Sequence, residues 1–119
     1  MFTREWRKNS KVGNPKLLPL LGMCRRANKL CCGHDSAVGA IRNKIAKLCL
    51  LSSDSSERLK NEIKREKDFS GGDMPVAVLE SDMYEIGKAT GLKSAVLTVN
   101  DEGFANAILE LLKTEEEVN

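Results

Sequence analysis

The stretch 33–54 combines residue types that can bind an anion. A glycine precedes a segment with apolar residues at helical spacing, Val38, Ile41 and Ile45, and Asp35 can cap the start of that helix. The first backbone N–H groups of a helix lack intrahelical acceptors and carry a partial positive charge, so they can donate to phosphate oxygens. The stretch therefore predicts contact with an anionic backbone, with RNA phosphate as the first candidate. Taken alone, it also fits an ordinary helix and strand of a packed domain.

Basic side chains near this stretch and later in the chain could supply cations to the same ligand. Several such contacts together produce strong, salt-sensitive affinity for a phosphate backbone. The candidates are Lys29, Arg42, Lys47, Lys88 and Lys93. Each of them also fits a solvated surface residue.

Three further residues could contact a nucleic acid. His34 is the only histidine and could stack on an unpaired base, although it also fits a solvated loop histidine, because no nucleophile or ordered acid partner is visible nearby. Asp54 could accept a hydrogen bond from RNA or cap the following helix. Trp6 could stack on a base or fold back onto the domain.

The chain shows no pattern of residues that would indicate catalysis or metal binding. Its four cysteines are Cys24, Cys31, Cys32 and Cys49. They form no C-x-x-C pair, and none has the spacing to histidine that is typical of a zinc site. They interrupt apolar positions, so we expect reduced, buried thiols. No P-loop, metal cluster or nucleophile–base pair can be assembled, which predicts a non-enzymatic protein without a cofactor.

Charge is strongly segregated along the chain. Residues 1–51 hold eleven Lys and Arg against two acidic residues, a formal charge of +9, and residues 52–119 hold eight against fifteen, a charge of −7. Such asymmetry indicates a side that binds a polyanion. The composition, 41% hydrophobic and 30% charged, is that of a soluble globular domain, and the N-terminus has no hydrophobic signal segment. We therefore expect a cytoplasmic monomer without a membrane partner.

Apolar periodicity and turn signals predict alternating helices and strands. Strands are expected at 29–32, 47–52, 76–79 and 95–99. The first two helices are expected at about 16–27 and 35–45. A third helix should begin at a capping box at 54–57 and end at about 66, followed by a loop at 67–75. A fourth should run from a cap at 81 or 82 to Gly91, and a fifth from a cap at 100 or 101 to about 112.

This alternation predicts an α/β fold, a three-layer α/β/α sandwich around a mixed sheet of about four strands. Residues 1–14 are expected to form a basic flexible arm, 15–113 a single domain, and 114–119 an acidic tail.

Two blocks of the sequence resemble the L7Ae superfamily of ribosomal proteins, which bind kink-turns in RNA. The first runs from Gly33 through Asp35-Ser36, Ala40-Ile41 and Ala46-Lys47-Leu48 to Asp54, and the second is Tyr84-Glu85-Ile86-Gly87-Lys88-Ala89-Thr90-Gly91-Leu92. The likeness covers about residues 17–112. It implies a fold of the predicted type and an RNA site around the glycine loop.

The chain is more similar still to a bacterial branch of small ribosome-associated proteins. The segments that carry this likeness are Leu20-Leu21-Gly22-Met23-Cys24-Arg25-Arg26-Ala27 and Asn100-Asp101-Glu102-Gly103-Phe104-Ala105. The chain departs from the superfamily pattern at three positions. Asp35-Ser36 stand where the superfamily has Asn-Glu, and Gly39 stands where it has a basic residue.

Two hypotheses follow for function. The first is a module that binds structured RNA, kink-turn-like or ribosomal, alone or on an assembling ribosome. Helix N–H groups after Gly33 and the basic residues would hold phosphates, and residues Leu92, Lys93 and Ser94 would pack against sugar or base. The second is a protein-interaction subunit whose acidic half docks a basic partner such as a ribosomal protein.

Overall fold

A computed structural model of the protein describes residues 15–118, apart from the side chains at 71 and 113–118. Helices and strands alternate along this part of the chain. In order they are α2 (Leu17–Arg26), β1 (Leu30–Cys32), α3 (His34–Arg42), β2 (Leu48–Leu51), α4 (Glu57–Glu66), the π-helical turn η1 (Lys67–Gly71), β3 (Val76–Val78), α5 (Met83–Thr90), β4 (Val96–Val99) and α6 (Glu102–Val118).

The four strands form one mixed sheet in the order β1-β4-β2-β3. β4 is antiparallel to both β1 and β2, whereas β2 and β3 are parallel. Every residue of the two central strands, β2 and β4, is buried. The predicted mixed sheet of about four strands is confirmed.

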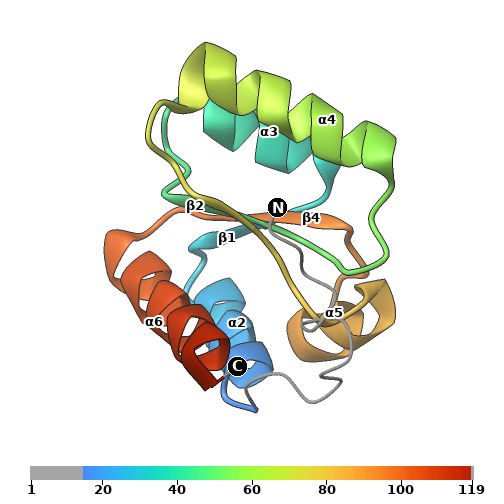
Figure 1. Ribbon diagram of the computed structural model, residues 1–119, viewed down its shortest axis with the longest axis vertical. Coiled ribbons are helices and arrows are strands. Elements are labelled where there is room, and N and C mark those ends of the chain that lie inside the picture. Colours follow the sequence, from blue (N-terminus) through green and yellow to red (C-terminus); the bar gives the residue numbers. More distant parts are fainter. Residues whose placement is uncertain (1–14, 119) are drawn as a thin grey trace.

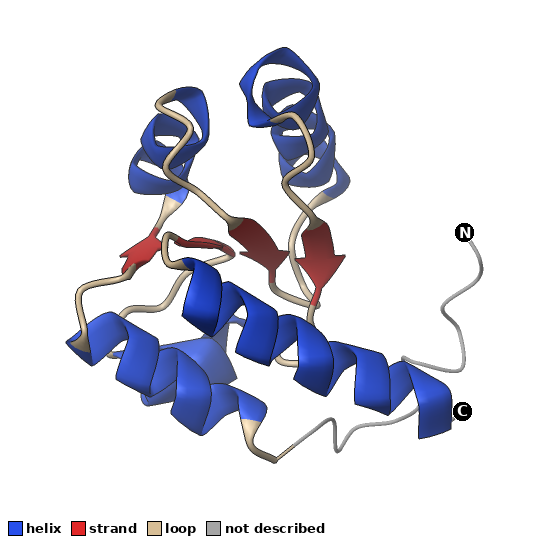
Figure 2. Ribbon diagram, turned by 90° about the vertical axis from the view of Figure 1, so that its left-hand side faces the viewer, coloured by secondary structure: helices blue, strands red, loops and turns tan. Residues whose placement is uncertain are grey.

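Helices cover both faces of the sheet. α3 and α4 lie side by side on one face, and α2, α5 and α6 cover the other, as Figures 1 and 2 show. Alternate residues of a strand point to opposite faces, so β2 supplies both cores. Leu48 and Leu50 pack toward α2, α5 and α6, while Cys49 and Leu51 pack toward α3 and α4. The predicted three-layer α/β/α sandwich is confirmed.

Several predicted helix ends are also observed. Asp82 and Glu85 form a capping box at the start of α5, and Gly91 ends that helix in the left-handed conformation with φ 91°. Asp101 caps α6 by accepting a hydrogen bond from the Phe104 backbone N–H at 2.9 Å. Short-range hydrogen bonds determine these ends, which is why the local sequence indicates them.

The boundaries of α3 differ from the prediction. Its N-cap is Gly33 and not Asp35, which is an exposed residue of the first turn. The helix ends at Arg42, because Asn43 caps it and Lys44 adopts a left-handed φ of 61°. Ile45, predicted to continue the buried stripe, therefore lies outside the helix and is 49% exposed.

One connection and the C-terminal segment also differ from the prediction. The loop expected at 67–75 begins with the π-helical turn η1, and α6 continues through the predicted tail to Val118. The arm expected at 1–14 lies outside the described residues. No helix in the described range 15–118 is long and apolar enough to cross a membrane.

All four cysteines are free, but they are not equally buried. Burial raises the pKa of the Cys24 thiol to about 11 and that of the Cys49 thiol to about 12, so both stay protonated at neutral pH. Cys31 and Cys32 are only half-buried. The expectation of four buried thiols is thus wrong for the β1 pair, because β1 is an edge strand.

Candidate nucleic-acid interface

The strand directions bring three distant loops to one edge of the sheet. The Gly33 N–H donates to the Val96 carbonyl oxygen at 3.0 Å, and the Ser52 N–H donates to the Ala95 carbonyl oxygen at 2.9 Å. β1 and β2 end at this edge and β4 begins there. We call it the loop edge and define it by residues 33–36, 52–54 and 92–95. It lies on the right in Figure 1.

The N-terminus of α3 lies at the loop edge, directly after the edge strand β1. No side-chain hydrogen bond caps this helix, and the Ala37 N–H makes the first backbone bond, to the Gly33 carbonyl oxygen at 3.0 Å. The N–H groups of residues 34–36 precede that bond and so have no intrahelical acceptor. The exposed Asp35 and Ser36 side chains flank them. This end of the helix can therefore donate hydrogen bonds to an anion.

Gly33 has a backbone conformation that other residues rarely adopt. Its φ is 96° and its ψ is 162°, a region occupied almost only by glycine. A Cβ atom at this position would meet nothing within 4 Å, so the dihedral angles and not space require glycine. The residue turns the chain sharply from β1 into α3 and leaves the first turn of α3 accessible.

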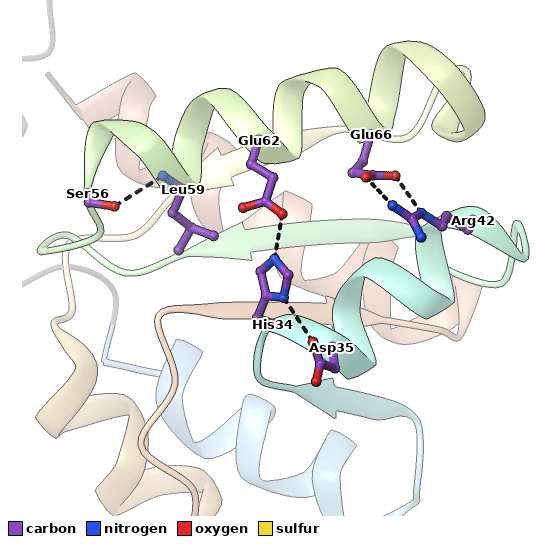
Figure 3. Close-up of polar contacts among 7 residues, drawn as sticks. All are labelled: His34, Asp35, Arg42, Ser56, Leu59, Glu62 and Glu66. Atoms are coloured by element: carbon purple, nitrogen blue, oxygen red, sulfur yellow. Dashed lines mark hydrogen bonds and ion pairs between the residues drawn. The ribbon is translucent and has the colours of Figure 1, made fainter.

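His34 connects the first turn of α3 to α4. Its Nε2 lies 2.6 Å from Glu62 Oε2, and its Nδ1 lies 3.1 Å from Asp35 Oδ1 (Figure 3). These hydrogen bonds, to Glu62 first and then to Asp35, raise the pKa of His34. Reasoning from the sequence missed both partners. Glu62 is 28 positions away and becomes a neighbour of His34 only because α3 and α4 pack side by side.

Asp54 joins the loop edge to α5. Its Oδ1 accepts a hydrogen bond from the Met83 backbone N–H at 3.2 Å. The capping role expected of Asp54 for the next helix is wrong, because Ser56 caps α4 by accepting from the Leu59 N–H at 3.1 Å (Figure 3). Asp54 instead satisfies an unpaired N–H group at the start of α5.

The loop after α5 presents two side chains and buries a third. Leu92 is 45% exposed and Lys93 is exposed, whereas Ser94 is 5% exposed and its hydroxyl donates to the Leu92 carbonyl oxygen at 3.4 Å. A Cβ atom on Gly87 would lie 3.2 Å from Lys93 Cα, so α5 packs closely against this loop. Ser94 therefore shapes the loop, and Leu92 and Lys93 are the groups available to a ligand.

The other predicted cations do not gather at the α3 N-terminus. Lys29 and Lys47 lie at the opposite edge, where the Lys29 carbonyl oxygen accepts from the Asn100 N–H and the Lys47 N–H donates to the Val99 carbonyl oxygen, both at 2.8 Å. Arg42 lies at the far end of α3. Its Nε and Nη2 donate to the two carboxylate oxygens of Glu66 at 3.0 and 2.8 Å (Figure 3).

Lys88 occupies the exposed side of α5, with its Nζ 5.3 Å from the centre of the Tyr84 ring. Tyr84 is 63% exposed and follows Met83, which Asp54 holds at the loop edge. Tyr84 is not among the site residues predicted from the sequence. The signal that could have found it is the i, i+4 spacing of the only tyrosine and a lysine.

Within the described residues, the mixed four-stranded sheet with helices on both faces and three loops at one edge defines a class of small α/β/α domains. Residues 16–109 match the Ribosomal protein L7Ae/L30e/S12e/Gadd45 family. The chain belongs to that family, which confirms the resemblance drawn from the two sequence blocks.

Two bacterial proteins are also similar to most of the chain. The RNA-binding protein YlxQ of Bacillus subtilis is 35% identical over 95 residues, which cover 79% of this chain and 92% of that protein. The RNA-binding protein YlxQ of Enterococcus faecium is 32% identical over 98 residues, which cover 82% and 92%.

Two solved structures share the fold. A protein with unknown function from Bacillus halodurans C has a TM-score of 0.73 and 30% identity, covering 82% of this chain and 97% of its own. The Giardia lamblia 15.5kD RNA binding protein has a TM-score of 0.65 and 15% identity, covering 87% and 88%. The second likeness shows the shared fold alone.

Proposed function

We propose that this protein is a non-enzymatic RNA-binding module of the ribosomal-protein type and that it holds structured RNA at the loop edge. One observation carries the location. The uncapped N-terminus of α3 and the exposed residues Leu92 and Lys93 lie at the same edge of the sheet, although about sixty positions separate them in sequence. Relatives that match most of the chain bear the name RNA-binding protein, which supports the ligand class.

The backbone of α3 provides the central contact in this proposal. N–H groups of residues 34–36 donate to phosphate oxygens, and the helix dipole adds a favourable field. Lys93 supplies a mobile cation beside them, and Lys88 approaches from α5. Leu92 packs its apolar side chain against a sugar or base, which excludes water from the phosphate contacts.

Acidic groups at the loop edge restrict which RNA can bind. Asp35 lies in the first turn of α3 and Glu62 contacts His34 in the same turn. Asp54 lies elsewhere on the loop edge, where it contacts the start of α5. A carboxylate repels a phosphate but accepts hydrogen bonds from base amino groups. We propose that the RNA places an exposed base edge, and not a phosphate, next to Asp35. Kink-turn RNA and looped ribosomal RNA present such edges, whereas a regular duplex hides them.

The biological setting follows from the same proposal. We propose that the protein is a cytoplasmic monomer that binds ribosomal RNA on the ribosome or on an assembly intermediate. Residues 15–113 would form the binding domain, and the basic arm at 1–14 would add charge to the complex.

The direct test compares the same charge reversal, lysine to glutamate, at two positions: one at the loop edge and one on α4 away from it. We expect Lys93→Glu to weaken binding to a kink-turn RNA by at least tenfold, about 1.4 kcal/mol. Lys64→Glu is the matched control, because Lys64 is an exposed residue of α4 about 10 Å along the helix from its start at the loop edge. Fluorescence anisotropy with labelled RNA measures both affinities, and circular dichroism checks that both variants fold.

Equal losses in the two variants would mean that affinity depends on net charge alone and that the loop edge is not the site. No binding of any structured RNA by the wild type would favour the alternative of a protein-docking subunit. In that case the acidic half of the chain would be the surface to examine.

A further inference from the structure

The edge of the sheet opposite the loop edge carries cations that the proposed RNA site does not use. Lys29 and Lys47 precede β1 and β2, and their backbone hydrogen bonds place them on either side of Asn100 at the end of β4. Neighbouring strands are about 4.8 Å apart, so the two lysine backbones are about 10 Å apart. Both side chains are exposed, and neither makes an ion pair within the described residues.

A third lysine ties this edge to η1. Lys44, in the turn between α3 and β2, extends its Nζ to the carbonyl oxygen of Ser70 at 3.4 Å. This contact holds the α3–β2 turn against the π-helical turn. The ends of α3, α4 and β4 all lie on the left in Figure 1, the side that faces the viewer in Figure 2.

An exposed aromatic ring accompanies these cations. Phe69, next to Ser70 in η1, is 91% exposed, the largest exposed fraction among the large hydrophobic side chains of the described residues. A phenylalanine left in water forgoes the free energy of burying it, so the ring is available to an apolar or aromatic ligand. π-helical turns are themselves rare and frequent at functional sites. We call Lys29, Lys44, Lys47 and Phe69 together the lysine edge.

Acidic residues also lie near the lysine edge. Asp68 and Asp73 flank Phe69 in sequence and are exposed, and Asp101 follows Asn100 but caps α6 through the Phe104 N–H. Glu66 is paired with Arg42. The three lysines therefore remain available to a ligand, whereas two of these four carboxylates already have partners.

We propose that the lysine edge is a second RNA contact, which takes a single-stranded segment: Phe69 stacks on an unpaired base, and Lys29, Lys44 and Lys47 hold the phosphates beside it. Stacking on an aromatic ring with cations along the backbone is the usual chemistry of single-strand binding. The inference rests on the proposed function. The two edges are separated by the length of the central strands, about 13 Å. One RNA with a structured element and a single-stranded extension could therefore contact both.

The experiment compares one kink-turn RNA with the same RNA carrying an extension of ten unpaired adenosines, by fluorescence anisotropy. For the wild type, we expect the extension to increase affinity by at least about fivefold, the lower end of the effect of one stacked base. Phe69→Leu keeps an apolar side chain and should abolish most of the gain, and Phe69→Tyr should restore it. Lys29→Gln/Lys47→Gln should reduce the gain and its dependence on salt.

Lys93→Glu at the loop edge is the control that separates the two proposals. It should weaken binding of both RNAs and leave the ratio between their affinities unchanged. A gain that survives in both Phe69→Leu and Lys29→Gln/Lys47→Gln overturns the inference. An extension that adds nothing to wild-type affinity also overturns it while leaving the loop-edge function intact, and an acidic protein surface then becomes the partner to test. Failure of either RNA to bind the wild type contradicts the proposed function itself.

Discussion

The backbone requires glycine at position 33 but not at position 39, although the two positions belong to the same segment. Gly33 has dihedral angles that require glycine, whereas Gly39 lies in the middle of α3, where glycine only weakens the helix. Neither position has an atom within 4 Å of an added Cβ. The same substitution should therefore have opposite effects at the two sites.

We expect Gly33→Ala to lower the free energy of unfolding by about 1–3 kcal/mol, because alanine is strained at φ 96° and ψ 162°. Gly39→Ala should raise it by up to about 1 kcal/mol, because alanine favours the helix and open space receives its methyl group. Urea unfolding of the two variants checks both signs. Equal destabilisation would show that α3 does not begin at residue 34.

His34 has two carboxylate partners, and its protonation should therefore depend on them. Both ring nitrogens can donate hydrogen bonds only in the imidazolium form. Contact with Glu62, and then with Asp35, raises the pKa of His34 above its ordinary value of 6.5. The folded state thus binds this proton more tightly than the unfolded state. The stabilisation is complete below pH 6.5 and disappears as the pH rises through the higher pKa of the folded protein.

The pH dependence can be measured on a single resonance, because the chain has only one histidine. We expect an NMR titration to give a His34 pKa above 6.5, and Glu62→Gln to lower it toward that value. The stability difference between wild type and His34→Gln should be below about 1 kcal/mol, because the pair is exposed, and should shrink from pH 6 to pH 9. A His34 pKa of 6.5 or lower would contradict the observed contacts.

At the scale of elements, α3 and α4 are joined at both ends by polar pairs. His34 contacts Glu62 near the start of α3, and Arg42 forms a two-bond ion pair with Glu66 near its end. Hydrogen bonding to Arg42 lowers the pKa of Glu66, which keeps this carboxylate ionised. The charge of a cation held in this way is already neutralised, so the cation attracts a phosphate only weakly. Arg42 therefore differs from Lys93, which forms no ion pair within residues 15–118.

Exchanging the partners tests the role of Arg42 without altering net charge. We expect Arg42→Glu/Glu66→Arg to keep the ion pair and to change RNA affinity by less than about twofold, as ordinary surface substitutions do. Arg42→Glu alone should lower the urea midpoint, because it places two carboxylates together. A tenfold loss of RNA affinity in the exchanged variant would instead make Arg42 a phosphate contact.

At the scale of the whole molecule, the segregation of charge along the sequence does not become one basic face. The described cations of the first half divide between the two ends of α2, the far end of α3 and the lysine edge. They are Lys16, Arg25 and Arg26 at α2, Arg42 at α3, and Lys29, Lys44 and Lys47 at the lysine edge. The sheet lies between them, with β1 and β2 connecting one edge to the other. An RNA that uses all of this charge must therefore contact more than one edge.

The salt dependence of affinity reports how many phosphates are neutralised. For about four contacts we expect a slope of roughly −3 to −4 in a plot of log affinity against log salt concentration. For the RNA with a single-stranded extension, Lys29→Gln/Lys47→Gln should make the slope shallower by about 2, one unit for each lysine. A flat response in the wild type would rule out phosphate contacts as the main source of affinity.

The local sequence was sufficient to predict much of the secondary structure. The strand expected at 47–52 is observed at Leu48–Leu51, and the caps at Asp82, Gly91 and Asp101 lie where expected. Such features depend on neighbours within one helical turn, so a short window of sequence contains their cause. Two motif blocks likewise indicated the family, because each is a set of residue types at a fixed spacing along the chain.

Cap choice shows where local information ends. Asp35 and Asp54 are good capping residues, yet Gly33 and Ser56 occupy the N-cap positions. Alternative caps one or two residues apart differ little in free energy, so tertiary contacts decide between them. Asp54 turns to the Met83 N–H of another helix, and the hydrogen bond between Gly33 and Val96 sets where α3 begins.

The amino-acid sequence by itself therefore determined the strands, most helix ends and the family of this protein, because those depend on residues close together in the chain. Tertiary structure alone decided which candidate site residues became neighbours. Lys29 is four positions from Gly33, but the direction of β1 carries them to opposite edges. His34 and Glu62 are 28 positions apart and lie in contact. Strand direction and helix packing set such distances, and both depend on how the whole chain buries its apolar residues.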